Sequence, residues 1–380
     1  MRRSPLKKGV RYFDHNATAP LHPAAREAWL AASEQFPGNP SSPHRWGQRA
    51  EAALAGARQQ VAGILGCDAL DLVWTSGATE SANAVFHHAA HAAAPGTEAW
   101  LSAIEHPCVI EAARRHFPRT HHFIPVTREG VADLNWLEQR LGNAVPAVVA
   151  LMAANNETGV LQPWREAREL CRRVDAPFFC DAVQWLGRLP AQELGGCDFV
   201  SASAHKFGGP RGMGFLKVPS QGRFEPMHLG GAQEDGRRAG TENVAGALAM
   251  VAALNARQKA MTSGDFSDAK TQFESQLVSR LPGCVVVGAG APRLWNTLSV
   301  VMPEADCRSR WVVKLDKAGF AVSTGSACAS GKESPSHVLL AMGFDAAAAG
   351  RALRFSGGPE TAPEDWAALL EALITLAATG

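Results

Sequence analysis

One stretch of the chain combines small residues, a histidine, a lysine and several glycines: Ser201-Ala-Ser-Ala-His205-Lys206-Phe-Gly-Gly-Pro-Arg-Gly-Met-Gly-Phe215. Small residues and glycines let the backbone approach a neighbouring group and adopt positive φ in a tight turn. Lys206 projects from this turn beside Ser203 and His205. A partly desolvated lysine has an accessible amine form and can react with an aldehyde to give a Schiff base. An ordinary surface lysine in a glycine-rich hairpin fits the stretch equally well, so the rest of the chain must decide.

The composition places the chain among globular proteins. With 380 residues it is long enough for two domains that share a core. A net charge of +1 gives no electrostatic basis for binding nucleic acid or an anionic membrane. No apolar run is long enough to span a bilayer, and the basic N-terminus lacks the apolar core of a signal peptide. The eight cysteines include no C-x-x-C pair, so we expect a cytoplasmic protein without a zinc or disulfide framework.

Predicted strands and helices alternate through the first part of the chain. After an opening loop at 11–23, helices are expected at 24–35 and 48–65. Strands at 71–75, 98–104, 144–153 and 177–181 then alternate with helices at 76–91, 108–116, 134–141 and 164–174. This order is typical of βαβ units and a mostly parallel sheet.

The pattern changes after residue 244. Helices are expected at 244–261, 266–281, 308–318, 337–342 and from 363, with short strands between them. We therefore predict an α/β fold with a large domain over residues 16–250, in which helices flank the sheet. A smaller α+β domain would combine residues 1–15 and 251–380.

Polar side chains follow the ends of several predicted strands. In parallel α/β sheets, ligands bind at the carboxyl ends of the strands. The polar residues found just past these ends are Thr79, His106, Asn156, Asp181 and Lys206. Their convergence at one edge of the sheet predicts a ligand site there.

Ser76-Gly77-Ala78-Thr79 opens a helix directly after a strand. The unpaired N–H groups and the dipole of such a helix terminus favour a phosphate group. A simple capping box would explain Ser76 and Glu80 but not Gly77, and the two interpretations are compatible.

Asp181 ends an otherwise apolar strand. A carboxylate there can keep a heteroaromatic ring nitrogen protonated, which makes the ring an electron sink. A turn or cap former is the common alternative for an isolated Asp. His106 could stack on such a ring or cap the helix after Pro107. Asn156 and Gln184 could donate to a ring oxygen, although such amides are more often ordinary loop residues.

A phosphate turn, an acidic ring partner, a stacking histidine and a Schiff-base lysine together describe a pyridoxal phosphate site. The chain resembles the cysteine desulfurases of the class V aminotransferase family, of the nitrogen-fixation and iron–sulfur-cluster type. The matching segments run in the family's order and cover nearly the whole chain: Tyr12–Thr18, Gly38–Ser42, Thr75–Ser81, Glu105–His106, Asn155–Gly159, Asp181–Gln184, Ser203–Lys206, Arg238–Thr241, Ser323–Cys328 and Arg354–Ser356.

The resemblance implies the fold type I of pyridoxal phosphate transferases, like aspartate aminotransferase, and a role for each matching residue. Lys206 would carry the cofactor and move the α-proton of the substrate, with His106 stacked on the ring and assisting proton transfers. Asp181 would pair with the ring nitrogen and Gln184 with the phenolic oxygen. The phosphate would be held by Ala78, Thr79, Ser203, His205 and, from the second subunit of a homodimer, Thr241. Asn156 and Arg354 would bind the substrate carboxylate, for which the arginine fork is suited.

The resemblance assigns the reaction to Cys328, which lies among small residues in Ser323–Lys332. L-cysteine would be converted to L-alanine while the Cys328 thiolate takes the sulfur as a persulfide, because the thiol is a poor nucleophile. A buried structural cysteine is the alternative, but the glycine and serine neighbours argue against it. The sulfur would pass to an acceptor protein, either an iron–sulfur scaffold or a thiolation enzyme.

Two other functions remain open. A selenocysteine or cystine lyase, or another class V aminotransferase, would need Lys206 and Asp181 but not Cys328. A non-catalytic sulfur carrier or scaffold is the third hypothesis, and the intact set of site residues argues against it. The chain departs from the family at Asp235, where a cation is usual near the expected subunit interface, and Arg237 and Arg238 are candidates to compensate.

Overall fold

The computed structural model describes residues 9–219, 221–263, 267–304, 308–324 and 335–378. A central sheet has seven strands in the spatial order β2 (Leu72–Thr75), β8 (Gly214–Lys217), β7 (Phe199–Ser203), β6 (Phe178–Asp181), β5 (Val148–Ala150), β3 (Ala99–Ser102) and β4 (His121–Ile124). Strand β8 runs antiparallel to both of its neighbours, and all other neighbours are parallel. The predicted mostly parallel sheet is therefore confirmed.

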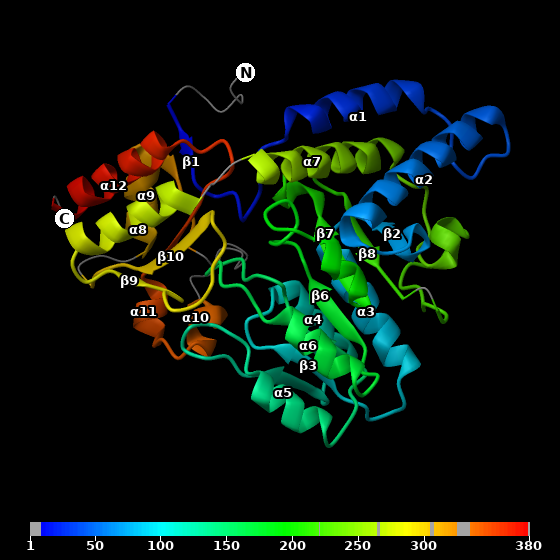
Figure 1. The fold of residues 1–380 in the computed structure, drawn as a ribbon, viewed down its shortest axis with the longest axis horizontal. Coiled ribbons are helices and arrows are strands. Elements are labelled where there is room, and N and C mark those ends of the chain that lie inside the picture. Colours follow the sequence, from blue (N-terminus) through cyan, green and yellow to red (C-terminus); the bar gives the residue numbers. More distant parts are fainter. Residues whose placement is uncertain (1–8, 220, 264–266, 305–307, 325–334, 379–380) are drawn as a thin grey trace.

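Helices cover both faces of this sheet (Figure 1). Strand residues alternate between two hydrophobic clusters, as the period of two in a strand requires. In β6, for example, Phe178 and Cys180 belong to one cluster and Phe179 to the other. The first cluster is closed by α1 (Pro23–Gln35), α2 (Arg45–Leu65), α5 (Leu134–Leu141), α6 (Trp164–Arg172) and α7 (Val244–Ser263). The second is closed by α3 (Ala78–Ala92) and α4 (Pro107–His116).

A second unit has its own small sheet and core. Its antiparallel strands lie in the order β12 (Ala352–Ser356), β10 (Thr297–Val301) and β9 (Val285–Val286). Its helices are α8 (Ser267–Arg280), α9 (Arg308–Lys317), α10 (His337–Ala341), α11 (Ala346–Gly350) and α12 (Pro363–Ala378). Phe13 packs edge-on against Trp366 in this core, with ring centroids 4.8 Å apart. The N-terminal segment is thus built into a unit made mostly of C-terminal residues.

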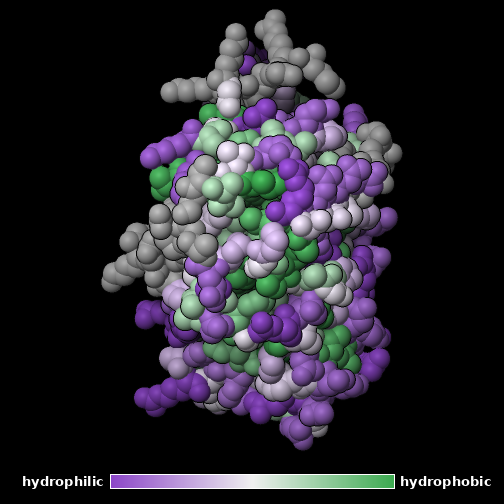
Figure 2. Space-filling view, turned by 90° about the vertical axis from the view of Figure 1, so that its left-hand side faces the viewer, coloured by the Kyte–Doolittle hydropathy of each residue, from purple (hydrophilic) through white to green (hydrophobic). Residues whose placement is uncertain are grey.

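The outer face of this second unit carries both hydrophobic and hydrophilic residues. Figure 2 shows hydrophobic patches between hydrophilic ones on this side of the molecule. Partly exposed apolar residues here include Val278 on α8 and Val313 on α9. Within the described ranges, no helix has both the length and the apolar character needed to cross a membrane.

The structure corrects several predicted elements. The opening loop was expected to span 11–23, but Arg11–Tyr12 forms β1, which pairs in parallel with β11 (Phe320–Ala321). A two-residue strand is too short to produce a periodic sequence pattern. Helix α2 begins at Arg45, three residues before the predicted Gln48, because His44 caps it by accepting from the Gly47 N–H. Helix α11 was not predicted; Asp345 caps it.

Candidate active site

The carboxyl ends of β2, β3, β5, β6 and β7 lie at one edge of the central sheet, since these strands run in the same direction. Asp181 is the last residue of β6 and Ser203 the last of β7. The ammonium group of Lys206 acts electrostatically on both Asp181 and His106. The expected gathering of polar residues at this edge is therefore observed.

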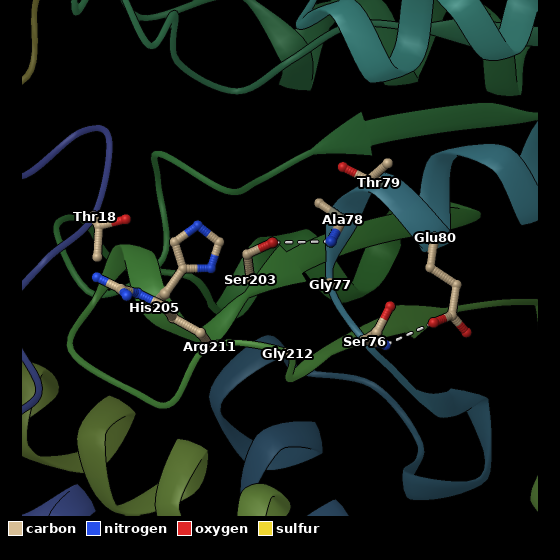
Figure 3. Close-up of a pocket in the computed structure, with 10 residues that line it drawn as sticks. All are labelled: Thr18, Ser76, Gly77, Ala78, Thr79, Glu80, Ser203, His205, Arg211 and Gly212. Carbon is tan, nitrogen blue, oxygen red and sulfur yellow. Dashed lines mark hydrogen bonds between the residues drawn. The ribbon is translucent and has the colours of Figure 1, made fainter. Parts of the chain in front are cut away.

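A cavity of about 250 Å³ opens at the N-terminus of α3 (Figure 3). The described residues that line it are Thr18, Ser76, Gly77, Ala78, Thr79, Glu80, Ser203, His205, Arg211 and Gly212. Four predicted phosphate ligands, Ala78, Thr79, Ser203 and His205, are among them. The cavity thus joins the start of α3 to the loop that follows β7.

Hydrogen bonds shape the wall of this cavity. The Ala78 amide donates to Ser203 Oγ over 2.9 Å, and the Ser76 amide donates to Glu80 Oε2 over 2.8 Å. The N-cap of α3 is Gly77 and has no side-chain cap, so the predicted Ser/Thr cap is wrong, although Glu80 accepts from the amide of the preceding residue, Ser76. Gly77 has φ of 148°, and a Cβ there would lie 3.2 Å from Ser203 Oγ. A cavity adjoins the turn, and the phosphate role of these residues stays a prediction.

Lys206 ends a short 3₁₀ turn, Ala204–Lys206, directly after β7. Its Nζ donates to the backbone carbonyls of Asn16, over 2.8 Å, and Ala17, over 3.0 Å. The lysine is thus held by the N-terminal segment, and it is not an ordinary surface lysine.

Asn16 connects three of the predicted site residues. Its carbonyl oxygen accepts from Lys206 and also from Gln184 Nε2, over 3.0 Å. Its Nδ2 donates to the carbonyl oxygen of Asn156 over 3.1 Å. Asn16 is 1% exposed. No role was predicted for it, although it lies in the matching segment Tyr12–Thr18.

Asp181 is buried, and its Oδ1 accepts from the Val183 amide over 3.0 Å and from Ser201 Oγ over 3.3 Å. The Val183 contact makes it a local turn former, which was the alternative to the ring-partner role. Burial raises the pKa of Asp181, against the effect of these hydrogen bonds and of Lys206. A protonated ring nitrogen would offset that cost of burial, so the residue suits a pyridinium partner.

His106 is the N-cap of α4, because its Nδ1 accepts from the Cys108 amide over 3.2 Å. An accepting Nδ1 places the proton of the neutral ring on Nε2. Burial, together with the positive charge of Lys206, lowers the pKa of His106 to about 4. The ring is therefore neutral near pH 7, and the predicted capping role is confirmed.

Glu105, the residue before His106, is fully buried. Its Oε1 accepts from the Met152 amide over 2.6 Å. Burial, and secondarily the charge of Asp181, raises the pKa of Glu105 well above its usual value. The pKa values of Glu105 and Asp181 are thus both raised, and Asp181 is the one on which the charge of Lys206 acts in the opposite direction.

Arg354 lies in β12 and its side chain is 2% exposed. Its Nη2 donates to Asp14 Oδ1 over 2.6 Å, and its Nη1 donates to the carbonyl oxygen of Asn156 over 3.0 Å. The two predicted carboxylate-binding residues are therefore neighbours. Asp14, which orients the guanidinium, was not predicted.

One predicted residue is not brought into this group. Thr241 is exposed in the segment before α7 and is not among the described residues that line the cavity. Cys328 lies outside the described residues. The nearest described residues on either side are Thr324 and Pro335. Close to them, Arg354 N donates to the Ser323 carbonyl over 2.7 Å and Ser336 Oγ donates to Glu157 Oε2 over 2.6 Å.

Of the two arginines considered as partners for the unusual Asp235, one pairs with it. Arg237 Nη2 lies 3.0 Å from Asp235 Oδ2. Arg238 instead pairs with Glu80, with its Nε 2.9 Å from Glu80 Oε1. Asp235 adopts φ of 56°, a left-handed conformation that aspartate tolerates better than most residues.

The sheet, the lysine after β7 and the acidic residue at the end of β6 define an α/β enzyme with the fold type I of pyridoxal phosphate transferases. The chain belongs to the aminotransferase class-V family, whose model matches residues 11–369. The resemblance noted in the sequence is thereby confirmed. This family, including its cysteine desulfurases, depends on pyridoxal phosphate.

Relatives with solved structures or curated names agree with this placement. A cysteine desulfurase from Klebsiella pneumoniae is 40% identical over 354 residues, which cover 91% of this chain and 87% of the relative. The structure of a NifS-like protein from Rickettsia africae matches with a TM-score of 0.87 and 28% identity, covering 97% of this chain and 99% of that one. SspA, solved in complex with cysteine, matches with a TM-score of 0.80 and 25% identity, covering 93% of this chain and 100% of that one.

Proposed function

We propose that this protein is a pyridoxal phosphate-dependent cysteine desulfurase, which converts L-cysteine to L-alanine and passes the sulfur to an acceptor protein. The observation that carries the proposal is the meeting of Lys206, Asp181 and the α3 cavity at one edge of the sheet. The cysteine desulfurases among its relatives cover nearly the whole chain, which supports the same activity.

The site residues fit the cofactor part by part. Lys206 is the covalent attachment point, Asp181 the partner of the ring nitrogen and Gln184 the partner of the phenolic oxygen. Gln184 Nε2 donates to the Asn16 carbonyl over 3.0 Å, and its second N–H would donate to the phenolic oxygen. His106 would stack on the ring. The residues that hold the phosphate are Ala78, Thr79, Ser203, His205 and the partner subunit's Thr241. When bound, the cofactor withdraws electrons from the α-carbon of the substrate.

The protein's own residues then carry the reaction. Arg354 and Asn156 bind the substrate carboxylate, and Lys206 removes the α-proton. The Cys328 thiolate attacks the substrate sulfur, so that a sulfur–sulfur bond forms and the carbon–sulfur bond breaks. The electron pair of the broken bond stays with the carbon, which takes up a proton and becomes a methyl group, and Lys206 returns a proton to the α-carbon to complete alanine. The enzyme is left with a persulfide on Cys328, and no external oxidant is needed.

The proposal includes the assembly and the setting of the enzyme. It acts as a homodimer in the cytoplasm, where Cys67, Cys171, Cys180, Cys197 and Cys284 remain as thiols. Its acceptor is an iron–sulfur scaffold or a thiolation enzyme. The large domain spans residues 16–250, and the small domain combines residues 1–15 and 251–380. Helix α7 crosses this boundary, because Val251 and Leu254 still pack in the first hydrophobic cluster.

The test is to incubate the holoenzyme with L-cysteine and a reductant and to quantify alanine and released sulfide. Equal amounts of both are expected from the wild type, and neither from Cys328→Ser. The matched control is Cys284→Ser, whose thiol is half-buried and whose pKa is raised to about 11 by burial, so it supplies little thiolate. This control should keep wild-type rates.

A Cys328→Ser enzyme that still produced alanine and sulfide at the wild-type rate would contradict the persulfide step. Pyruvate in place of alanine would indicate a lyase. Amino transfer to a keto acid would indicate an aminotransferase. Full cofactor occupancy without any turnover of free L-cysteine would favour a carrier or scaffold role.

A further inference from the structure

Arg211 lies in the loop between Lys206 and β8, and its side chain reaches the cavity at the start of α3. Figure 3 shows its guanidinium group beside Thr18, with His205 and Ser203 between it and Ala78. Arg211 and His205 line the same cavity, and the positive charge of Arg211 is one of the causes that lower the pKa of His205. The left-handed φ of Gly208 and Gly212, 91° and 73°, bends the loop on either side of it.

The cavity lining carries less positive charge than the phosphate proposed for it carries negative charge. A phosphate monoester carries a charge of roughly −1.5 to −2 near pH 7. Among the described residues that line the cavity, Arg211 is the one Lys or Arg side chain. His205 does not supply a second charge, because burial and the charges of Lys206 and Arg211 lower its pKa to about 4.

The acidic residue at the cavity does not cancel Arg211. Glu80 is already engaged by Arg238, whose Nε lies 2.9 Å away, and by the Ser76 amide. Although burial raises the pKa of Glu80, these hydrogen bonds lower it on balance. The carboxylate is thus already paired with Arg238 and the Ser76 amide. Arg211 therefore faces the cavity as its positive group.

We propose that Arg211 is a cofactor-binding residue that neutralises the phosphate of the bound cofactor and donates to its oxygens. The inference rests on the proposed function, in that it concerns the same pyridoxal phosphate site. A guanidinium group presents a planar pair of donors that matches a phosphate, and such charge-assisted bonds are stronger than neutral ones. Ala78, Thr79, Ser203 and His205 then supply neutral donors, and Arg211 supplies the charge.

The test compares two ligands that differ only in the phosphate. Full-length apoprotein of the wild type, Arg211→Gln and Arg211→Lys is titrated with pyridoxal phosphate and with pyridoxal, and the dissociation constants are measured by absorbance. Arg211→Gln should weaken pyridoxal phosphate by roughly 10- to 100-fold, as expected for hydrogen bonds to a charged group, and pyridoxal by less than about twofold. Arg211→Lys keeps the charge and should retain most of the affinity.

The matched control is Arg223→Gln, an arginine whose side chain is 86% exposed and which does not line the cavity. It should bind both ligands as the wild type does. Inorganic phosphate gives a second readout: it should compete with pyridoxal phosphate in the wild type and compete less in Arg211→Gln.

Three outcomes overturn the inference: unchanged pyridoxal phosphate affinity in Arg211→Gln, an equal loss for both ligands, or an Arg211→Lys variant as weak as Arg211→Gln. Each of these leaves the proposed function intact, provided that the wild type binds the cofactor. A wild-type protein that binds no pyridoxal phosphate would instead overturn the proposed function.

Discussion

The guanidinium group of Arg354 is held by Asp14, with 2.6 Å between Arg354 Nη2 and Asp14 Oδ1. This contact joins the middle of β12, an edge strand of the small sheet, to a residue only two positions after β1. It fixes the orientation of the arginine that the substrate carboxylate would meet.

Asp14→Ala should therefore raise KM for L-cysteine several-fold with a smaller change in kcat, because a misoriented guanidinium weakens binding of the carboxylate. The free energy of unfolding should fall by roughly 1–3 kcal/mol, the cost of removing one partner of a buried charge-assisted bond. Steady-state kinetics and urea unfolding check both effects. The control is Asp365→Ala, which breaks the exposed pair with Arg11 and should cost less than about 1 kcal/mol. An unchanged KM in Asp14→Ala would contradict the orienting role.

Lys206→Arg should abolish covalent attachment of the cofactor, because the guanidinium group is not a usable nucleophile near neutral pH. Borohydride treatment followed by mass spectrometry should find a cofactor adduct in the wild type and none in the variant. Lys317→Arg, at an exposed position on α9, is the control and should retain the adduct. A persistent adduct in Lys206→Arg would place the attachment at another lysine.

His106→Asn and His106→Ala separate the cap of α4 from the function of the ring. Asparagine can still accept from the Cys108 amide, so His106→Ala should be less stable than His106→Asn by roughly 1 kcal/mol. Both should lose at least about tenfold in kcat, because neither has an imidazole to assist proton transfer.

His44 provides the matched control for the cap, since its Nδ1 accepts from the Gly47 amide at the start of α2. His44→Ala should be less stable than His44→Asn by a similar amount, and neither variant should lose kcat. A His106→Asn enzyme with wild-type kcat would show that the ring has no catalytic role.

The lowered pKa of His15 predicts that the folded protein loses stability in mild acid. Burial is the main reason that its pKa is lowered to about 4, from 6.5. The unfolded chain therefore binds a proton that the folded chain does not, and stability falls as the pH drops below 6.5 until it reaches about 4. His15→Gln should reduce the loss of unfolding free energy between pH 7 and 4.5 by about 2 kcal/mol relative to the wild type.

Urea unfolding at the two pH values measures this difference. The comparison of variants is needed because Asp181 and Glu105, whose pKa values are raised, change stability in the opposite direction over part of this range. His91→Gln, an exposed position, should follow the wild type. A His15→Gln protein with the pH dependence of the wild type would contradict the prediction.

Much of the fold could be predicted because its signals are local. The helix Leu134–Leu141 has the predicted bounds, since Asp133 caps its start and an apolar face repeats at helical spacing. The strand expected at 144–153 is shorter, Val148–Ala150, because the apolar run continues past the last paired residue. Apolarity marks burial there and does not mark where the ladder of hydrogen bonds ends.

The candidate site was predictable where it depends on strand ends. Asp181 and Ser203 end β6 and β7, and strand direction alone brings them to the same edge. The hydrogen bonds that hold the Lys206 ammonium group were not predictable. They go to the backbone carbonyls of Asn16 and Ala17, which any residue type would supply. The pair of Asp14 and Arg354 was missed since no local pattern joins residues so far apart in the chain.

The position of the N-terminal segment has a consequence for how the enzyme comes into being. Residues 11–17 are synthesised before residues 319–356, yet Arg11 and Phe13 bond to Gly319 and Ala321, and His15 bonds to Ser356. The same segment supplies the carbonyls that hold Lys206. A nascent chain can build its central sheet early, but the N-terminal segment reaches its final contacts only after residues 319–356 have been synthesised. Such long-range closure is slow, so we expect cofactor capture to follow the synthesis of Ser356.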